Sequence, residues 1–166
     1  HVILMVPTEK NPIWLENTSQ RIAFNHLSYD THNRNVLAVN ENGIQLIDTP
    51  VYKTEESTEK LLGKIKITED GSISSQANFE FSGGQYDFNL GLFTLKNDEL
   101  IDALKRRHSN IKIDQLSISN LKNDRDLAKI IYDLDLKATS FSKKIGNDLF
   151  FPVMPYYSAT TFSANE

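Results

Sequence analysis

The sequence predicts a mainly β protein: an antiparallel, β-sandwich-like domain with one α-helix. Apolar and polar residues alternate in several segments, which is typical of strands that are buried on one face. Asn-, Asp- and Gly-containing turns separate these segments, as in hairpins. Only one segment, at about 97–108, has the capping and apolar pattern of a helix.

The composition is that of an ordinary globular protein. The chain has 166 residues, of which 39% are hydrophobic and 24% are charged, so it is long enough to bury a core. Its formal net charge is −4 and its charges are interspersed, which gives no electrostatic footprint for nucleic acid. No apolar run approaches the roughly 20 residues of a membrane span. We therefore expect neither a nucleic-acid partner nor a membrane span.

Residues 1–52 offer short apolar runs separated by turns. The runs at 2–6 and 13–15 could pair with each other. Those at 36–39 and 44–47 flank an Asn-Glu-Asn-Gly sequence, which favours a hairpin because Asn and Gly tolerate positive φ. The charged and Ser/Thr-rich stretch at 53–60 has no apolar periodicity and is interpreted as a linker.

Residues 61–166 are predicted to form the antiparallel β domain. A long hairpin turns at Asp70-Gly71 and buries odd-numbered residues as far as Phe81. Residues 111–118 read as a strand whose alternation slips near Gln115, as a bulge would produce. Residues 130–137 alternate cleanly and read as a further half-buried strand.

The helix at about 97–108 has signals at both ends. Asn97 is the expected N-cap, and acidic residues follow it in the first turn. Leu100, Ile101 and Leu104 share one face. The basic triplet at 105–107 lies where it complements the helix dipole, and we prefer this interpretation to an anion-binding role.

Two segments together carry a family resemblance: residues 1–6, which open with His1, and residues 12–20, which contain a Trp-Leu-Glu triplet ending at Glu16. They resemble the end of the transglutaminase-like core of secreted or surface proteins of bacteria. The resemblance continues to Pro50 and, from about residue 57 to 155, into a β domain of unknown function that often follows this core. It implies that residues 1–52 are the terminal strands of such a core.

The resemblance implies a papain-like chemistry. His1 matches the catalytic imidazole and Glu16 the carboxylate that orients it, although Asp is more usual at that position. The sequence has no cysteine, and the family's nucleophile would lie upstream of His1. We therefore expect a non-catalytic C-terminal structural or interaction fragment that is inactive alone. Its partner would be the remainder of a parent acyltransferase or cysteine protease in the bacterial envelope, periplasmic or surface-exposed.

A second hypothesis comes from a different class of protein. A β-sandwich module could bind a glycan or peptide at the bacterial cell surface through a sheet face or through its aromatic tail, which includes Tyr156, Tyr157 and Phe162. Buried rings would favour the scaffold interpretation, and an exposed aromatic patch would favour binding. Trp14 is expected to be a core or site-wall aromatic rather than a sugar-stacking platform.

A metal site is one hypothesis for His26, Asp30 and His32, because their imidazole and carboxylate groups suit zinc or nickel. They lie in a polar loop without a second pair of ligands at a recognised spacing, so we expect structural roles. The sequence therefore predicts no cofactor and no metal.

Overall fold

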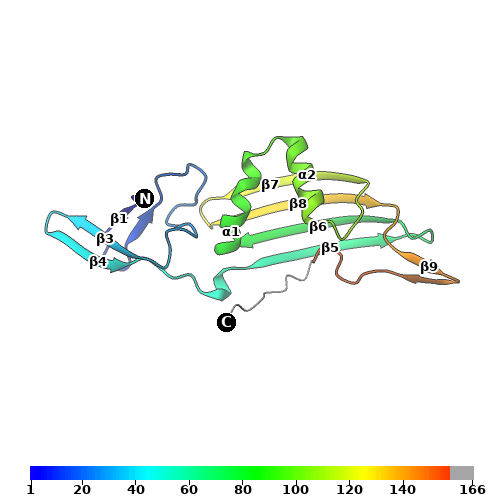
Figure 1. Ribbon diagram of the computed structural model, residues 1–166, viewed down its shortest axis with the longest axis horizontal. Helices are drawn as coiled ribbons and strands as arrows, with labels where there is room; N and C mark the ends of the chain where they lie inside the picture. The colour runs from blue at the N-terminus through cyan, green and yellow to red at the C-terminus, as the bar shows by residue number, and fades with distance from the viewer. Residues whose placement is uncertain (158–166) are drawn as a thin grey trace. The chain divides into compact units, whose positions relative to one another are not determined.

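The computed structural model describes residues 1–157. It is mainly β with antiparallel sheets, which confirms the predicted fold class (Figure 1). The strands are β1 (Leu4–Val6), β2 (Ile13–Leu15), β3 (Asn35–Asn40), β4 (Gly43–Asp48), β5 (Glu59–Ile67), β6 (Ile73–Ser82), β7 (Gln115–Asp124), β8 (Lys129–Ala138), β9 (Lys143–Ile145) and β10 (Asp148–Phe150). The helices are α1 (Gly84–Asn89) and α2 (Asn97–Arg107), with short 3₁₀ turns at Thr54–Glu56 and Leu90–Thr94.

The contacts divide the chain into two compact units. Unit 1 contains residues 1–61, 79–94 and 121–132, and unit 2 contains residues 62–78, 95–120 and those from 133 onward. The long strands form one sheet in the order β5-β6-β8-β7, and each of them contributes residues to both units. The boundary that the sequence places between residues 52 and 61 stays a prediction.

The two hairpins expected in residues 1–52 are present in unit 1. Strands β1 and β2 pair antiparallel, with Leu4 opposite Leu15. Strands β3 and β4 also pair antiparallel, and the turn between them includes Gly43 at φ +122°, a conformation that favours glycine. The pairing prediction and the hairpin prediction are therefore both confirmed.

The core of unit 1 is built from aromatic side chains. Phe79 and Phe81 on β6 lie on one face because they are two residues apart, and Tyr132 on β8 packs on both. The ring centroids of Phe79 and Tyr132 are 4.7 Å apart, and those of Phe81 and Tyr132 are 5.5 Å apart. All three rings are buried, as is Tyr86 on α1. The predicted alternation is confirmed on β6 as far as Phe81, but it is wrong for β5, where Ile65 is 36% exposed.

Unit 2 buries the apolar face of the same strands beside α2. The buried residues are Ile73 and Ala77 on β6, Leu134 and Leu136 on β8, and Leu100 and Leu104 on α2. The C-terminus of α2 agrees with the sequence prediction and its N-terminus does not. Its basic last turn is as expected, but the N-cap is Lys96 rather than Asn97, which is the first helical residue.

The N-terminus of α2 is fixed by an acidic side chain instead of by its cap residue. The Glu99 carboxylate accepts a hydrogen bond from the Lys96 backbone N–H at 2.9 Å. This is the reciprocal half of a capping box, so it satisfies a backbone donor even though lysine offers no acceptor. The sequence pattern therefore predicted the helix at its observed position, but it predicted the N-cap at Asn97, one residue after the observed N-cap Lys96.

Two further segments differ from the sequence prediction. The short helix α1 follows Gly83 directly. This glycine has φ +59°, and a Cβ added to it would lie only 2.6 Å from the Glu56 carbonyl oxygen, too close to be accommodated. The strand predicted at 111–118 begins at Gln115 and continues to Asp124. Ile111 instead closes a turn, in which its N–H donates to the His108 carbonyl at 2.9 Å. The alternation slips near Gln115 because residues 111–114 precede the strand, and not because of a bulge.

Neither helix of the described residues has the length and apolar character that a membrane-crossing helix requires.

Candidate functional site

The structure brings His1 and Glu16 together in unit 1. Antiparallel pairing of β1 and β2 places the start of one strand beside the end of the other. The His1 Nε2 atom lies 3.0 and 3.1 Å from the two Glu16 carboxylate oxygens. The Glu16 side chain is 1% exposed and the His1 side chain is 44% exposed. The pair is therefore a covered carboxylate with an imidazole that solvent can reach.

The Glu16 carboxylate is held by a turn of its own segment. Its Oε1 atom accepts hydrogen bonds from the Thr18 backbone N–H at 3.2 Å and from the Thr18 hydroxyl at 2.7 Å. These donors hold the carboxylate in place independently of His1. They can do so because the chain turns after Glu16 and brings the Thr18 donors back to its side chain. The Glu16 carboxylate is thus anchored by the backbone and the side chain of Thr18.

The arrangement has a defined tautomer. Both carboxylate oxygens can only accept when ionised, so His1 Nε2 carries the proton that they share. The Nδ1 atom forms no hydrogen bond within residues 1–157. No thiol accompanies the pair, since the sequence contains no cysteine.

A second cluster lies in unit 1 around His26. Its Nε2 atom lies 2.9 Å from Asp87 Oδ1, and both side chains are more than nine-tenths buried. The His26 ring stacks on Tyr52 at a centroid distance of 5.0 Å and an interplanar angle of 4°. Tyr86 meets the same imidazole edge-on at 5.1 Å. His26 therefore serves as a buried polar link between residues distant in sequence.

Sequence reasoning missed this cluster. It grouped His26 with Asp30 and His32, whereas the carboxylate that bonds His26 comes from Asp87, 61 residues away on α1. His32 does lie near, with its ring centroid 5.0 Å from that of Tyr52. In residues 1–157, no three His, Asp or Glu side chains are arranged to hold a metal ion. No local signal could have pointed to Asp87.

Burial has a measurable consequence for Tyr52. It raises the pKa of the phenol to about 12, and the nearby Asp87 and Glu56 charges act in the same direction. The Leu27 backbone N–H, which donates to the Tyr52 oxygen at 2.7 Å, acts in the opposite direction. The phenol therefore stays neutral throughout the physiological range.

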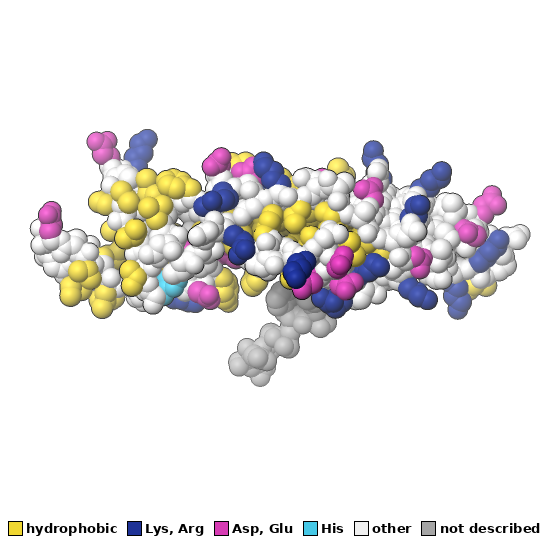
Figure 2. Space-filling model, turned by 90° about the horizontal axis from the view of Figure 1, so that it is seen from above, with side chains coloured by type: hydrophobic (Ala, Val, Ile, Leu, Met, Phe, Trp, Pro, Cys, Tyr) yellow, Lys and Arg dark blue, Asp and Glu magenta, His cyan; other side chains and the backbone are white. Residues whose placement is uncertain are grey.

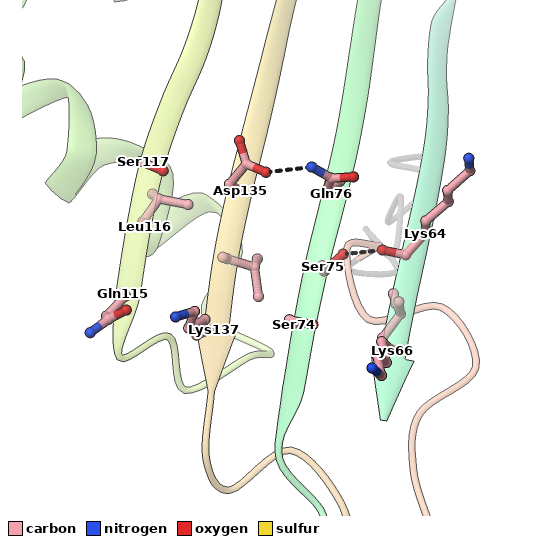
Figure 3. Close-up of a pocket in the computed structure, with 12 residues that line it drawn as sticks. Lys64, Lys66, Ser74, Ser75, Gln76, Gln115, Leu116, Ser117, Asp135 and Lys137 are labelled. Carbon is pink, nitrogen blue, oxygen red and sulfur yellow. Dashed lines mark hydrogen bonds between the residues drawn. The ribbon is translucent and has the colours of Figure 1, made fainter. Parts of the chain in front are cut away.

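Unit 2 carries a separate groove on the sheet, with a volume of about 530 Å³ (Figure 3). The Gln76 amide donates to the Asp135 carboxylate at 2.9 Å, which joins β6 to β8 across the groove. Three lysines from β5 and β8 also line it: Lys64, Lys66 and Lys137. None of the three forms an ion pair within the described part of the chain. The groove is consequently a polar surface with surplus positive charge.

The other predicted positions are structural or exposed. Trp14 is buried at the centre of β2 and is 5% exposed. Tyr156 is also buried, and its hydroxyl donates to the Ser75 hydroxyl at 2.6 Å, whereas Tyr157 is 60% exposed. Phe162 lies outside the described residues. The basic residues Lys105, Arg106 and Arg107 form the last turn of α2, where the predicted dipole role places them.

No protein-family model, no curated protein and no solved structure matches this chain. The transglutaminase-like resemblance therefore stays a prediction that rests on the sequence features described above.

Proposed function

We propose that this chain is the C-terminal structural or interaction part of a transglutaminase-like protein of the bacterial envelope, inactive by itself because it contains no cysteine. On this proposal it would supply the imidazole and the orienting carboxylate of a Cys-His-carboxylate site, and the thiol would come from the rest of the parent protein. The observation that carries the proposal is the His1–Glu16 pair, in which a 1% exposed carboxylate holds an accessible imidazole. Such a carboxylate fixes the tautomer of an imidazole that serves as a general base.

An exposed aliphatic face on the β3–β4 hairpin supports the same proposal. Leu37 lies opposite Leu46, and Val39 lies opposite Ile44, so all four side chains share one face. They are between 67% and 75% exposed. Figure 2 shows hydrophobic side chains gathered over the part of the chain that holds β1 to β4. A contiguous apolar face of this kind fits burial against further polypeptide, such as the remainder of a parent enzyme.

The decisive experiment uses the coding sequence and the full-length protein. The region preceding the His1 codon is expected to encode a cysteine at the start of a helix, where a thiolate is stabilised. In that longer protein, Glu16→Gln should lower kcat/KM for amide substrates by about 10²–10⁴-fold, because the imidazole loses its orienting charge. Glu9→Gln, an exposed position in the loop between β1 and β2, is the matched control and should leave turnover unchanged.

The 166-residue chain by itself should show only background rates on the same substrates, because it contains no thiol. Turnover by this chain that Glu16→Gln abolishes would contradict the proposal. A longer protein without any cysteine would contradict it as well.

The groove in unit 2 favours a second candidate function, a surface module that binds a glycan or peptide. Its lining combines amide and hydroxyl groups with Lys64, Lys66 and Lys137, and only Asp135 carries negative charge (Figure 3). Since no aromatic ring among residues 1–157 lines the groove, those residues offer no stacking surface for a neutral sugar ring. Charge complementarity instead favours an acidic glycan.

This second candidate predicts binding of polygalacturonate but not of neutral dextran, measured by isothermal titration calorimetry. Replacing all three groove lysines with glutamine should weaken binding about tenfold or more, since each exposed ion pair contributes up to about 1 kcal/mol. The charge-matched control replaces three exposed lysines outside the groove, Lys143→Gln and Lys144→Gln on β9 together with Lys10→Gln. Equal losses in both variants, or equal binding of dextran, would rule out the groove as the site.

A further inference from the structure

A second cavity lies in unit 1. The His1–Glu16 pair does not line it, and it shares Tyr52 with the His26 cluster. Its volume is about 550 Å³, which falls in the range of small-ligand pockets, roughly 300–1,000 Å³. Trp14 and Tyr52 are the aromatic residues that line it, and Asp48 and Glu56 are the charged ones. Within the described residues, no lysine, arginine or histidine contributes to the lining.

The aromatic residues are fixed before any ligand arrives. The Trp14 backbone N–H donates to the Asn25 side-chain oxygen at 2.9 Å, which anchors β2 against the opposite loop. Tyr52 is held at two points. Its hydroxyl oxygen accepts a hydrogen bond from the Leu27 N–H, and its ring stacks on His26. His26 is itself held by Asp87. Rigid aromatic residues of this kind lose little entropy when a ligand binds.

The charge of the cavity is uncompensated. Neither Asp48 nor Glu56 forms an ion pair within residues 1–157. The Glu56 carboxylate is oriented by the Lys53 backbone N–H at 2.7 Å, and the Asp48 carboxylate accepts from the Asn35 amide. Each of these hydrogen bonds thus comes from a neutral donor. A cation beside them would gain Coulomb attraction to the carboxylates and to the faces of the aromatic rings.

We propose that this cavity binds a cationic group on an apolar stem, an alkylammonium or guanidinium. The cation would lie with the aromatic residues Trp14 and Tyr52 on one side and the carboxylates of Asp48 and Glu56 on the other. The apolar stem would contact the aromatic and proline surfaces, including Pro12 and Pro50. A lysine or arginine side chain of a polypeptide and a free organic amine share this chemistry. The ligand class is independent of any role of His1 and Glu16.

The single tryptophan of the sequence makes the test direct. Trp14 is the only tryptophan, so the intrinsic indole emission comes from a residue that lines this cavity. The full chain would be titrated with N-acetyl-lysine N-methylamide, N-acetyl-arginine N-methylamide and the uncharged N-acetyl-norleucine N-methylamide. The two cationic compounds should shift the emission saturably, more weakly as salt is added, and the norleucine compound should not.

The matched variants separate this cavity from general charge effects. Asp48→Asn combined with Glu56→Gln should weaken binding of the cationic compounds about tenfold, whereas Glu55→Gln, at the exposed neighbour of Glu56, should change it by less than about twofold. Circular dichroism would confirm that each variant is folded. The proposal is overturned if norleucine binds equally well, if the double variant binds unchanged, or if no compound saturates.

A further titration with n-butylamine identifies the source of the cation. Tighter binding of the blocked lysine or arginine would assign the cavity to a polypeptide side chain, because the ligand then also uses its backbone. Equal binding of n-butylamine would assign it to a small amine. Both results support the proposed chemistry, and absence of binding by all the cations contradicts it.

Discussion

Replacing Phe79 with alanine is expected to lower the free energy of unfolding by about 3–5 kcal/mol, the usual cost of deleting a buried phenyl ring. Phe79 is 1% exposed and packs against Tyr132 at a centroid distance of 4.7 Å. The ring lies on a strand between hydrogen-bonded neighbours, so the backbone can collapse only partly into the space it leaves. Urea unfolding followed by circular dichroism and Trp14 emission would measure the loss.

Phe88→Ala is the matched control for this prediction. It deletes the same side chain at a position that is 63% exposed, so we expect a loss below about 1 kcal/mol. Similar losses for the two variants would contradict the assignment of Phe79 to the core. A variant of Phe79 that is unfolded without urea would agree with it, since a loss of this size can exceed the margin of a small domain.

Acidification is expected to destabilise the protein through His108. This side chain is 2% exposed, and burial lowers its pKa from 6.5 to about 4, with the neighbouring Arg107 charge acting in the same direction. In the unfolded chain the imidazole takes up a proton near pH 6.5, whereas in the folded protein it does so only near pH 4. The unfolded state therefore binds more protons throughout this interval. Folding stability falls by about 1.4 kcal/mol per pH unit, about 3 kcal/mol in all.

The pH dependence can be assigned to His108 by comparison. The free energy of unfolding would be measured from pH 7 to pH 5, above the range where carboxylates with lowered pKa such as Asp114 contribute. His108→Gln should remove most of the slope, whatever it does to the stability at pH 7. An equal slope in both proteins would contradict the prediction. The Cε1 proton of His108, followed by NMR, provides the pKa directly if the variant is too unstable.

Local sequence signals were sufficient for the strands and the hairpins. The alternation from Ile73 to Phe81 predicted a buried face, and the structure buries each odd-numbered residue in that run. Turn residues such as Gly71 and Gly43 marked where the chain reverses, because both adopt positive φ. These features depend only on residues that are close in sequence, which is why pattern reasoning could find them.

The errors arose where contacts distant in sequence decide the local structure. Ile111 looked like a strand residue, but it is buried within a turn next to His108. The short helix α1 was missed because Gly83-Gly84 predicts an end rather than a start. Gly83 is required there by the close approach of the Glu56 carbonyl, a contact across 27 residues that no local pattern contains.

The candidate sites divide in the same way. His1 and Glu16 were named from the sequence, and the antiparallel β1–β2 pairing that joins them follows from short-range hairpin geometry. Their catalytic role stays a proposal. The His26–Asp87 pair and the cavity lined by Trp14 and Tyr52 could not be named, because they join segments that loops hold together.

By itself, the sequence determined the β class, the hairpins, the position of the long helix and the absence of any thiol, since each of these is written in composition or in spacings of a few residues. Only the tertiary structure decided which polar groups are buried and which carboxylates form no ion pair within the described residues. It also decided that burial lowers the pKa of the His108 imidazole. The physical reason is that burial and Coulomb interactions depend on distance in space, and folding brings together residues such as His26 and Asp87 that the chain keeps 61 positions apart.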